Sequence, residues 1–422
     1  MKIFETHTAR YIDYNGNASI MKWIPPFTAC RALSSTAAVA TSSGTTGDWF
    51  HPSLINPAWS LGTDYEICGL RKRLTSGTLT VGYHYRIASY VSSDDFTNVG
   101  CPQNATGQCF IATGTTPTTW TNGSVLVENE MGGFWVDMYL CSSYDATMSS
   151  MGTVASVDVT DAYVSQPLVA PRVSQDIGHF RKYLKQRFSY GCFDFELPNG
   201  GDPQSITKYA GKGGLITDAH WFELWIWTRI NRWLLRGNTN GYNASNHIPQ
   251  WHLDPNDIGI LDGSLSSSYG ASITGGGGKF WDIPVSDFCG NRWEFTDGLR
   301  LYNGGIYSAG KTVNPFTDPG DGYGHASFTN TGCSISGVTL GYSIASYRTE
   351  AALKRHGIAA STTTAGQGGF DGQGWSHDSS GERISLRGGS CYDGARCPGA
   401  LTLYNAPSFV NWNIGARAVL VP

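Results

Sequence analysis

Few side chains with metal-binding chemistry are spaced as known metal sites require. Residues 254–262 carry three aspartates, and carboxylate oxygens are ligands that Ca²⁺ prefers, but the spacing is not that of an EF-hand. His247 and His252 form the one close histidine pair, without a third ligand at metal spacing. Pro249 lies between them and argues against a single helical face. The sequence therefore predicts no metal site, and a cation bound at 254–262 is kept as an alternative.

The sequence also lacks the usual motifs of nucleophilic catalysis and phosphate binding. No Cys-x-x-Cys pair, nucleophile elbow or Ser/His/Asp arrangement stands out. The glycine-rich stretches 275–278 and 366–369 have neither the lysine nor the strand–helix context of a phosphate-binding loop. Cys101/Cys109 and Cys391/Cys397 are close enough to bridge short loops, whereas buried thiols are expected elsewhere. We therefore predict no catalytic residue and no cofactor.

Residues 387–417 combine turn-forming glycines with apolar residues at strand spacing. In this pattern Leu401 and Leu403 face a core, while Thr402 and Tyr404 face the opposite side. Several side chains of mixed chemistry lie between the scaffold positions. They are Tyr392, Asp393, Arg396, Thr402, Tyr404, Phe409 and Val410. The pattern predicts a rigid scaffold that presents a varied surface, as a recognition site requires.

Three ordered landmarks within residues 215–417 carry a family resemblance. They are Leu215-Ile-Thr-Asp-Ala-His-Trp221 with the following Arg236-Gly-Asn-Thr-Asn-Gly241, then Gly290-Asn-Arg-Trp-Glu-Phe295, then the Arg-Gly-Gly-Ser, Asn-Ala-Pro-Ser and Trp-Asn-Ile-Gly-Ala-Arg elements of the C-terminal segment. Together they resemble the C-type-lectin-like fold of phage and diversity-generating-retroelement variable proteins, a superfamily that includes the formylglycine-generating enzymes. Such a domain has a small twisted sheet, two helices and long loops. The resemblance implies that the seven mixed positions are solvent-facing ligand contacts.

The resemblance implies a non-enzymatic receptor-binding protein at the tip of a phage tail fibre or similar virion appendage. Such a protein is made in the host cytoplasm, joins other virion tail proteins as a homotrimer and binds a host cell-surface protein or glycan. A cellular display or adhesion protein of the same family and a virion decoration protein are alternatives. A third is a formylglycine-generating-type copper oxidase, because Cys391 and Cys397 follow a Gly-Gly-Ser and thiolates suit Cu(I). Both cysteine spacings depart from the enzyme pattern.

The composition of the 422-residue chain narrows the fold class and excludes some partners. A chain of this length predicts two or three domains. Abundant glycine (53 residues), 21 tyrosines, 14 tryptophans and only 15% charged residues favour loop-rich β structure or an α+β fold with long irregular segments. Basic residues (29) and acidic residues (33) nearly balance, without a basic stripe, so nucleic acid is not an expected partner. No signal peptide or long apolar window is found, so membrane insertion is not expected either.

We predict two domains. Residues 1–123 form a β-rich attachment and oligomerisation domain, a sandwich or prism, with its clearest strand at 78–90. Residues 20–26 are interpreted as a contact arm or an edge strand. Residues 124–422 form the α+β, lectin-like ligand-binding domain. The alternating residues 132–141 resemble its first strand, which in the family pairs with the C-terminal strand.

Two helices are predicted in the second domain. Ser174 caps the first, from Gln175 to Gln186, with an apolar face formed by Ile177, Phe180 and Leu184. The second starts after Thr217 or Asp218, runs to about Leu235 and can end at Gly237. By the resemblance, residues 290–295 are a buried framework turn in which Trp293 fills the core and Glu294 accepts buried hydrogen bonds.

Overall fold

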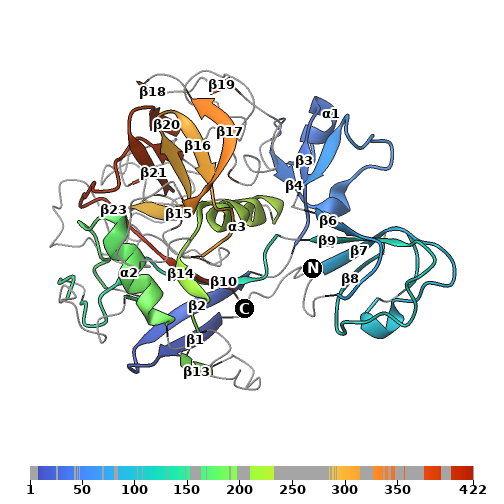
Figure 1. Cartoon of the computed structure of the whole chain (residues 1–422), viewed down its shortest axis with the longest axis horizontal. Helices are drawn as coiled ribbons and strands as arrows, with labels where there is room; N and C mark the ends of the chain where they lie inside the picture. Colours follow the sequence, from blue (N-terminus) through green and yellow to red (C-terminus); the bar gives the residue numbers. More distant parts are fainter. Residues whose placement is uncertain are drawn as a thin grey trace. The chain divides into compact units, whose positions relative to one another are not determined.

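The computed structural model shows a β-rich α+β chain with several sheets and few helices (Figure 1). It describes residues 8–421 with gaps, of which the longest are 153–162, 197–209, 232–284, 314–326, 347–355, 357–374 and 391–400. Two compact units are present. Unit 1 comprises Met1–Trp23 and Trp135–Pro422, and unit 2 comprises Ile24–Phe134. This division differs from the expected boundary between residues 123 and 124, because the first strands of the chain pair with strands of unit 1.

The first sheet of unit 1 brings both ends of the chain together. Its strand order is β13 (Cys192–Glu196), β1 (Thr8–Asp13), β2 (Ala18–Ile24), β10 (Phe134–Asp137), β24 (Ala418–Leu420) and β14 (Gly213–Leu215). Trp135 pairs antiparallel with Leu420, which confirms that the strand within 132–141 pairs with the C-terminal strand. The expectation of an arm or edge strand at 20–26 was wrong for residues 20–24. They belong to β2, which has a neighbour on each side.

The second sheet of unit 1 is the largest sheet among the described residues. Its order is β18 (Val338–Leu340), β20 (Trp375–Asp378), β22 (Leu401–Leu403), β21 (Glu382–Arg387), β15 (Trp293–Tyr302), β16 (Gly305–Ser308), β17 (Thr329–Ile335) and β19 (Ile344–Ser346). A further strand, β23 (Ile414–Gly415), pairs parallel with β15. A separate short pair is formed by β11 (Cys141–Ser142) and β12 (Val164–Ser165). Residues Glu294 to Leu301 of β15 are all buried, as in a strand covered on both faces.

The predicted turn at 290–295 is therefore a strand from Trp293 onward. Trp293 is half-buried and packs against the edge of the core cluster rather than filling it. Glu294 is fully buried and accepts two hydrogen bonds from Arg417, at 2.5 and 2.7 Å, which confirms its expected role.

Helix α2 (Ile177–Arg187) packs its apolar face into the core of unit 1. Ile177, Phe180 and Leu184 are buried there as predicted. The cap is Asp176 rather than Ser174, because the Asp176 carboxylate accepts a hydrogen bond from the His179 backbone N–H at 2.8 Å. The ring centroids of Phe180 and Phe295 lie 5.7 Å apart and join the helix to β15.

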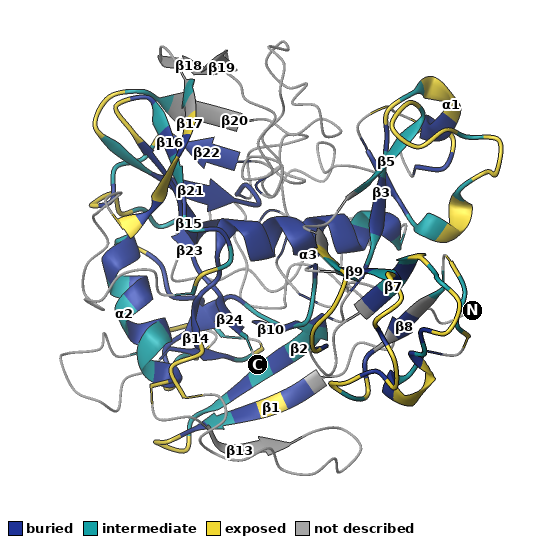
Figure 2. Cartoon of the chain, turned by 45° about the vertical axis from the view of Figure 1, so that its right-hand side comes forward, coloured by how far each residue is buried: buried dark blue, intermediate teal, exposed yellow. Residues whose placement is uncertain are grey.

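Helix α3 (Asp218–Ile230) is buried along its length (Figure 2). Thr217 caps it, as one of the two predicted alternatives, and accepts a hydrogen bond from the His220 backbone N–H at 3.2 Å. A helix that is buried all round is surrounded by protein on every side. It ends at Ile230, before the predicted end at Leu235, and Gly237 lies outside the described residues. No helix among the described residues is long and apolar enough to span a membrane.

Unit 2 contains two small sheets, each with its own apolar cluster. The first has the order β4 (Trp49–Phe50), β3 (Ala29–Ala32) and β5 (Tyr65–Cys68). The second has the order β6 (Arg71–Leu74), β9 (Val125–Asn129), β7 (His84–Ser89) and β8 (Cys109–Ile111). Short helices are α1 (Ser35–Ala38), η1 (Pro52–Leu54) and η2 (Thr97–Val99). The strand predicted at 78–90 corresponds to β7, and the unit is β-rich as expected.

Candidate functional site

The predicted ligand-binding positions divide into exposed, buried and undescribed residues. Tyr404, Phe409 and Val410 are exposed, with 50%, 36% and 51% of their surface accessible. Thr402 is only 6% exposed, so its predicted solvent-facing orientation was wrong. The reason is that β22 lies between β20 and β21 and is buried on both faces, so that alternation along the strand exposes neither side. Tyr392, Asp393 and Arg396 lie outside the described residues.

The exposed positions belong to a loop, residues 404–413, whose backbone is held by other elements. Three hydrogen bonds from distant residues fix it. They join Ile384 N to Asn405 O (3.0 Å), Ser174 N to Asn411 O (3.0 Å) and Trp293 N to Asn413 O (2.8 Å). Within the loop, Phe409 N donates to Ala406 O at 2.9 Å. The exposed side chains therefore project from a backbone with little freedom to move.

Segment 388–400, which contains the three undescribed positions, begins and ends at adjacent points of the sheet. Arg387 and Leu401 are direct partners in the antiparallel pairing of β21 with β22. Gly388 has φ +86°, and an added Cβ would lie 3.1 Å from the Phe288 backbone oxygen. Glycine suits such a position because it tolerates positive φ and a close backbone approach. The start and the end of the segment are thus fixed by described residues.

Residues at the start of β15 and just before it bond to Gly388 and to loop 404–413. Gly290 N donates to Gly388 O at 2.9 Å, while Trp293 N donates to Asn413 O at 2.8 Å. Arg292 lies between Gly290 and Trp293 in the sequence, and its guanidinium is 5.2 Å from the centroid of the Trp412 ring, within cation–π range. Gly388 and loop 404–413 are therefore held by neighbouring residues of the chain.

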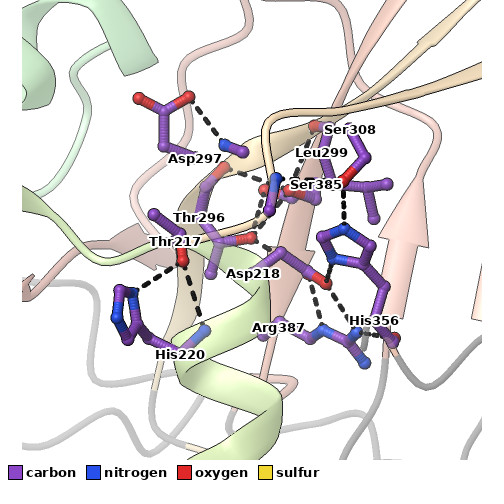
Figure 3. Close-up of polar contacts among 12 residues, drawn as sticks. Thr217, Asp218, His220, Thr296, Asp297, Leu299, Ser308, His356, Ser385 and Arg387 are labelled. Atoms are coloured by element: carbon purple, nitrogen blue, oxygen red, sulfur yellow. Dashed lines mark hydrogen bonds and ion pairs between the residues drawn. The ribbon is translucent and has the colours of Figure 1, made fainter. Parts of the chain in front are cut away.

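A buried polar cluster joins the start of α3 to β15, β16 and β21 (Figure 3). Ser308 Oγ lies 2.7 Å from His356 Nε2, and His356 Nδ1 lies 2.8 Å from Asp218 Oδ1. Ser308 ends β16, and Asp218 is the first residue of α3. Asp218 and His356 are fully buried, and Ser308 is 7% exposed.

Arg387, the last residue of β21, binds the same carboxylate on both oxygens. Its Nε donates to Asp218 Oδ2 at 2.8 Å, its Nη2 donates to Oδ1 at 2.9 Å, and Nη2 also donates to the backbone oxygen of His356. The guanidinium lies 5.5 Å from the Trp221 ring centroid and 5.7 Å from that of Phe222. Burial raises the pKa of Asp218, but the charge of Arg387 and the hydrogen bond from His356 lower it by a larger amount, and the pKa falls to about 2. Asp218 is therefore a carboxylate at neutral pH.

Neighbouring hydroxyl groups and a second ion-paired aspartate extend the cluster. Thr296 Oγ1 donates to Asp218 Oδ2 at 3.3 Å and shares a 2.7 Å hydrogen bond with Ser385 Oγ. Asp297, the next residue in β15, accepts from Arg181 Nε of α2 at 2.7 Å. Interior polar groups need partners of this kind, because an unsatisfied one is costly. The cluster ties the N-terminal end of α3 and helix α2 to the sheet.

The order Ser308–His356–Asp218 is that of an acyl-transfer triad, which the sequence did not reveal. In a triad the histidine takes the serine proton, and the aspartate stabilises the resulting imidazolium. Here the positive charge of Arg387, bound to the same carboxylate, opposes a charged imidazole. Ser308 Oγ also accepts a 3.0 Å hydrogen bond from Gly310 N–H and is almost fully buried. These features favour a role in holding the fold together over nucleophilic catalysis.

The two proposed metal-binding groups of the sequence, Cys391 with Cys397 and residues 254–262, lie outside the described residues. In the part of the chain that the structure describes, no three His, Cys, Asp or Glu side chains are grouped to hold a metal ion. Cys141 is an unpaired buried thiol, and burial raises its pKa, which makes it unreactive. No protein-family model matches the chain, and no curated protein matches it.

Proposed function

We propose that the chain is a phage virion receptor-binding protein that recognises a host cell-surface protein or glycan. The binding surface consists of loop 404–413 together with segment 388–400. One observation carries the proposal: Tyr404, Phe409 and Val410 are exposed on a loop whose backbone is hydrogen-bonded to three distant residues. The role is that of a binding protein and not of an enzyme.

Three large exposed apolar side chains lie within seven residues of one loop. Other large exposed apolar side chains among the described residues of unit 1 are single ones, such as Tyr14, Tyr144 and Tyr302. Isolated exposed apolar residues are ordinary, whereas a group of them marks an interaction site. Aromatic side chains on a rigid backbone also lose little conformational entropy on binding, so that more of the contact energy contributes to affinity.

The proposal includes a homotrimer bound to other tail proteins, because several copies of a modest site bind a cell surface with high avidity. A cellular display or adhesion protein would use the same surface and differs in where the protein resides. A decoration protein would need no ligand surface, so the exposed loop favours the receptor-binding role over it. The copper oxidase alternative depends on Cys391 and Cys397 alone.

Cell binding by a loop variant tests the proposal. The variant carries Tyr404→Ala, Phe409→Ala and Val410→Ala, and the matched control carries Tyr14→Ala, Tyr144→Ala and Tyr302→Ala. Labelled wild-type and variant proteins are titrated onto a panel of intact bacterial strains, after their melting temperatures have been compared. We expect the loop variant to bind roughly tenfold more weakly than wild type or worse, because a few aromatic side chains commonly supply most of the binding energy of an interface. The control should bind as wild type does. Equal binding by both variants would contradict the proposal.

A further inference from the structure

Arg172 differs from other buried arginines of unit 1 in its electrostatic partners. Five arginines of unit 1 each lie within 2.5–3.3 Å of a carboxylate oxygen: Arg181, Arg187, Arg300, Arg387 and Arg417. Arg172 is only 2% exposed, yet it forms no ion pair with any described residue. Its guanidinium makes one long hydrogen bond, from Nη1 to Met151 O at 3.5 Å. Arginine stays charged in proteins, and a buried charge without a counter-charge is strongly unfavourable, so a compensating negative charge is expected.

Two neighbouring side chains also present buried polar atoms. Arg172 Nε, Tyr163 Oη and His179 Nε2 are all buried and hydrogen-bond to no described residue. The ring centroids of Tyr163 and His179 lie 6.0 Å apart. Burial raises the pKa of Tyr163 and lowers that of His179, and the nearby charge of Arg172 lowers both pKa values. Tyr163 therefore keeps its proton at neutral pH and can donate a hydrogen bond.

The backbone around Arg172 is held by two strands. Arg172 N donates to Cys141 O in β11 at 2.8 Å. An added Cβ at Gly415 of β23 would lie 3.5 Å from Arg172 O, so these two segments are in close contact. Tyr163 directly precedes β12, which pairs with β11, and His179 belongs to α2. The three polar atoms are thus presented by separate elements of one folded unit.

We propose that Arg172, Tyr163 and His179 bind a small monovalent anion, such as chloride, in the interior of unit 1. Arg172 Nε–H, Tyr163 Oη–H and, in the matching tautomer, His179 Nε2–H can each donate a hydrogen bond to it. A water molecule could accept the same hydrogen bonds but would leave the charge of Arg172 uncompensated. The inference is independent of the receptor-binding role, because it concerns the interior and not the exposed loop.

Chloride-dependent stability tests the site in solution. Wild type and variants are unfolded with urea while sodium chloride replaces sodium fluoride at constant ionic strength, because the smaller fluoride ion loses more hydration energy on burial. The variants are Arg172→Met and Tyr163→Phe. Tyr11→Phe is the matched control, because it removes another buried hydroxyl of unit 1, bonded to Arg187 O at 3.4 Å.

The expected result is a chloride dependence that follows the site. The unfolding equilibrium constant of wild-type unit 1 should fall roughly tenfold for each tenfold rise in chloride above the dissociation constant of the site. Tyr11→Phe should keep this dependence, Tyr163→Phe should shift it to higher chloride, and Arg172→Met should abolish it. Equal chloride dependence in wild type and Arg172→Met overturns the proposal. If Arg172→Met does not fold, an unshifted dependence in Tyr163→Phe overturns it instead.

Anomalous diffraction from wild-type crystals grown in sodium bromide locates the ion directly. We expect a bromide peak within hydrogen-bond distance of Arg172 Nε and Tyr163 Oη. A water molecule at this position, or no bromide peak there, overturns the proposal. A bromide peak at Arg172 without any chloride dependence of stability would indicate an adventitious ion only and would also overturn it.

Discussion

Three buried carboxylates of unit 1 and one of unit 2 are stabilised in different ways. In unit 1, Glu294, Asp218 and Asp297 each face an arginine side chain at 2.5–2.8 Å. In unit 2, Asp94 instead accepts hydrogen bonds from the backbone N–H groups of Thr121, Asn122 and Ser124, at 2.8–3.0 Å. The first arrangement buries two opposite charges, whereas the second spreads one charge over local dipoles.

The sequence separation of the partners shows what each arrangement specifies. Glu294 and Arg417 are 123 residues apart, and Asp218 and Arg387 are 169 apart. Asp94 reaches partners only 27–30 residues away, all within one loop-rich region. Buried ion pairs therefore hold distant segments of unit 1 in register, whereas the Asp94 hydrogen bonds define local loop structure in unit 2.

Removal of the Glu294 charge should produce the largest effect. The Glu294→Gln substitution leaves the buried guanidinium of Arg417 without its counter-charge. We expect the free energy of unfolding of unit 1 to fall by about 3–5 kcal/mol, measured by urea denaturation. The matched control is the Glu294→Leu/Arg417→Met double variant, which removes both charges and should lose less. A loss below about 1 kcal/mol for the single variant would show that the pair behaves like a surface ion pair.

Replacement of Asp94 should have an intermediate, pH-dependent effect. Burial raises the pKa of Asp94, but hydrogen bonds from Ser124, Asn122 and Thr121 lower it by a larger amount, and the pKa falls to about 2. The folded-state pKa is thus below its ordinary value of 3.8, so the stabilisation is present above about pH 4 and is lost as the pH falls towards 2. We expect Asp94→Asn to reduce the stability of unit 2 at pH 6 by about 1–3 kcal/mol.

Urea denaturation of wild type and Asp94→Asn at a series of pH values checks both parts. The stability difference should shrink between about pH 4 and pH 2, because the wild-type carboxylate becomes protonated and loses its advantage. A stability difference that stays constant over this range would show that the negative charge of Asp94 does not contribute to the stability of unit 2.

The local features of the fold were predictable from the sequence. The apolar periodicity located α2 and α3, and Thr217 was one of two predicted caps of α3. The pairing of β10 with β24 and the burial of Glu294 followed from the family resemblance. The exposure of Tyr404, Phe409 and Val410 was expected from the same resemblance.

Apart from the pairing of β10 with β24, which the resemblance implied, long-range contacts were not predictable, because no local pattern encodes them. Strand β2 neighbours β10 in the sheet of unit 1, although the whole of unit 2 lies between the two strands in the sequence. Nothing in residues 8–24 indicates that β10 is their neighbour. Ser308 and His356 are 48 residues apart, and His356 and Asp218 are 138 apart, so their contact exists only in the folded chain. Thr402 was misjudged because alternation indicates two faces of a strand but not whether both are covered.

The Arg31–Glu66 pair of unit 2 should have the smallest effect and sharpens the comparison with unit 1. The two residues are direct cross-strand partners in β3 and β5, with Arg31 Nη1 3.2 Å from Glu66 Oε1. Their side chains are 22% and 24% exposed, so water and salt weaken the attraction. A double-mutant cycle of Arg31→Ala and Glu66→Ala should give a coupling of about 0.2–1 kcal/mol that decreases at high salt. A large coupling that is insensitive to salt would mean that unit 2 also depends on desolvated ion pairs, and the contrast with Glu294 and Arg417 would fail.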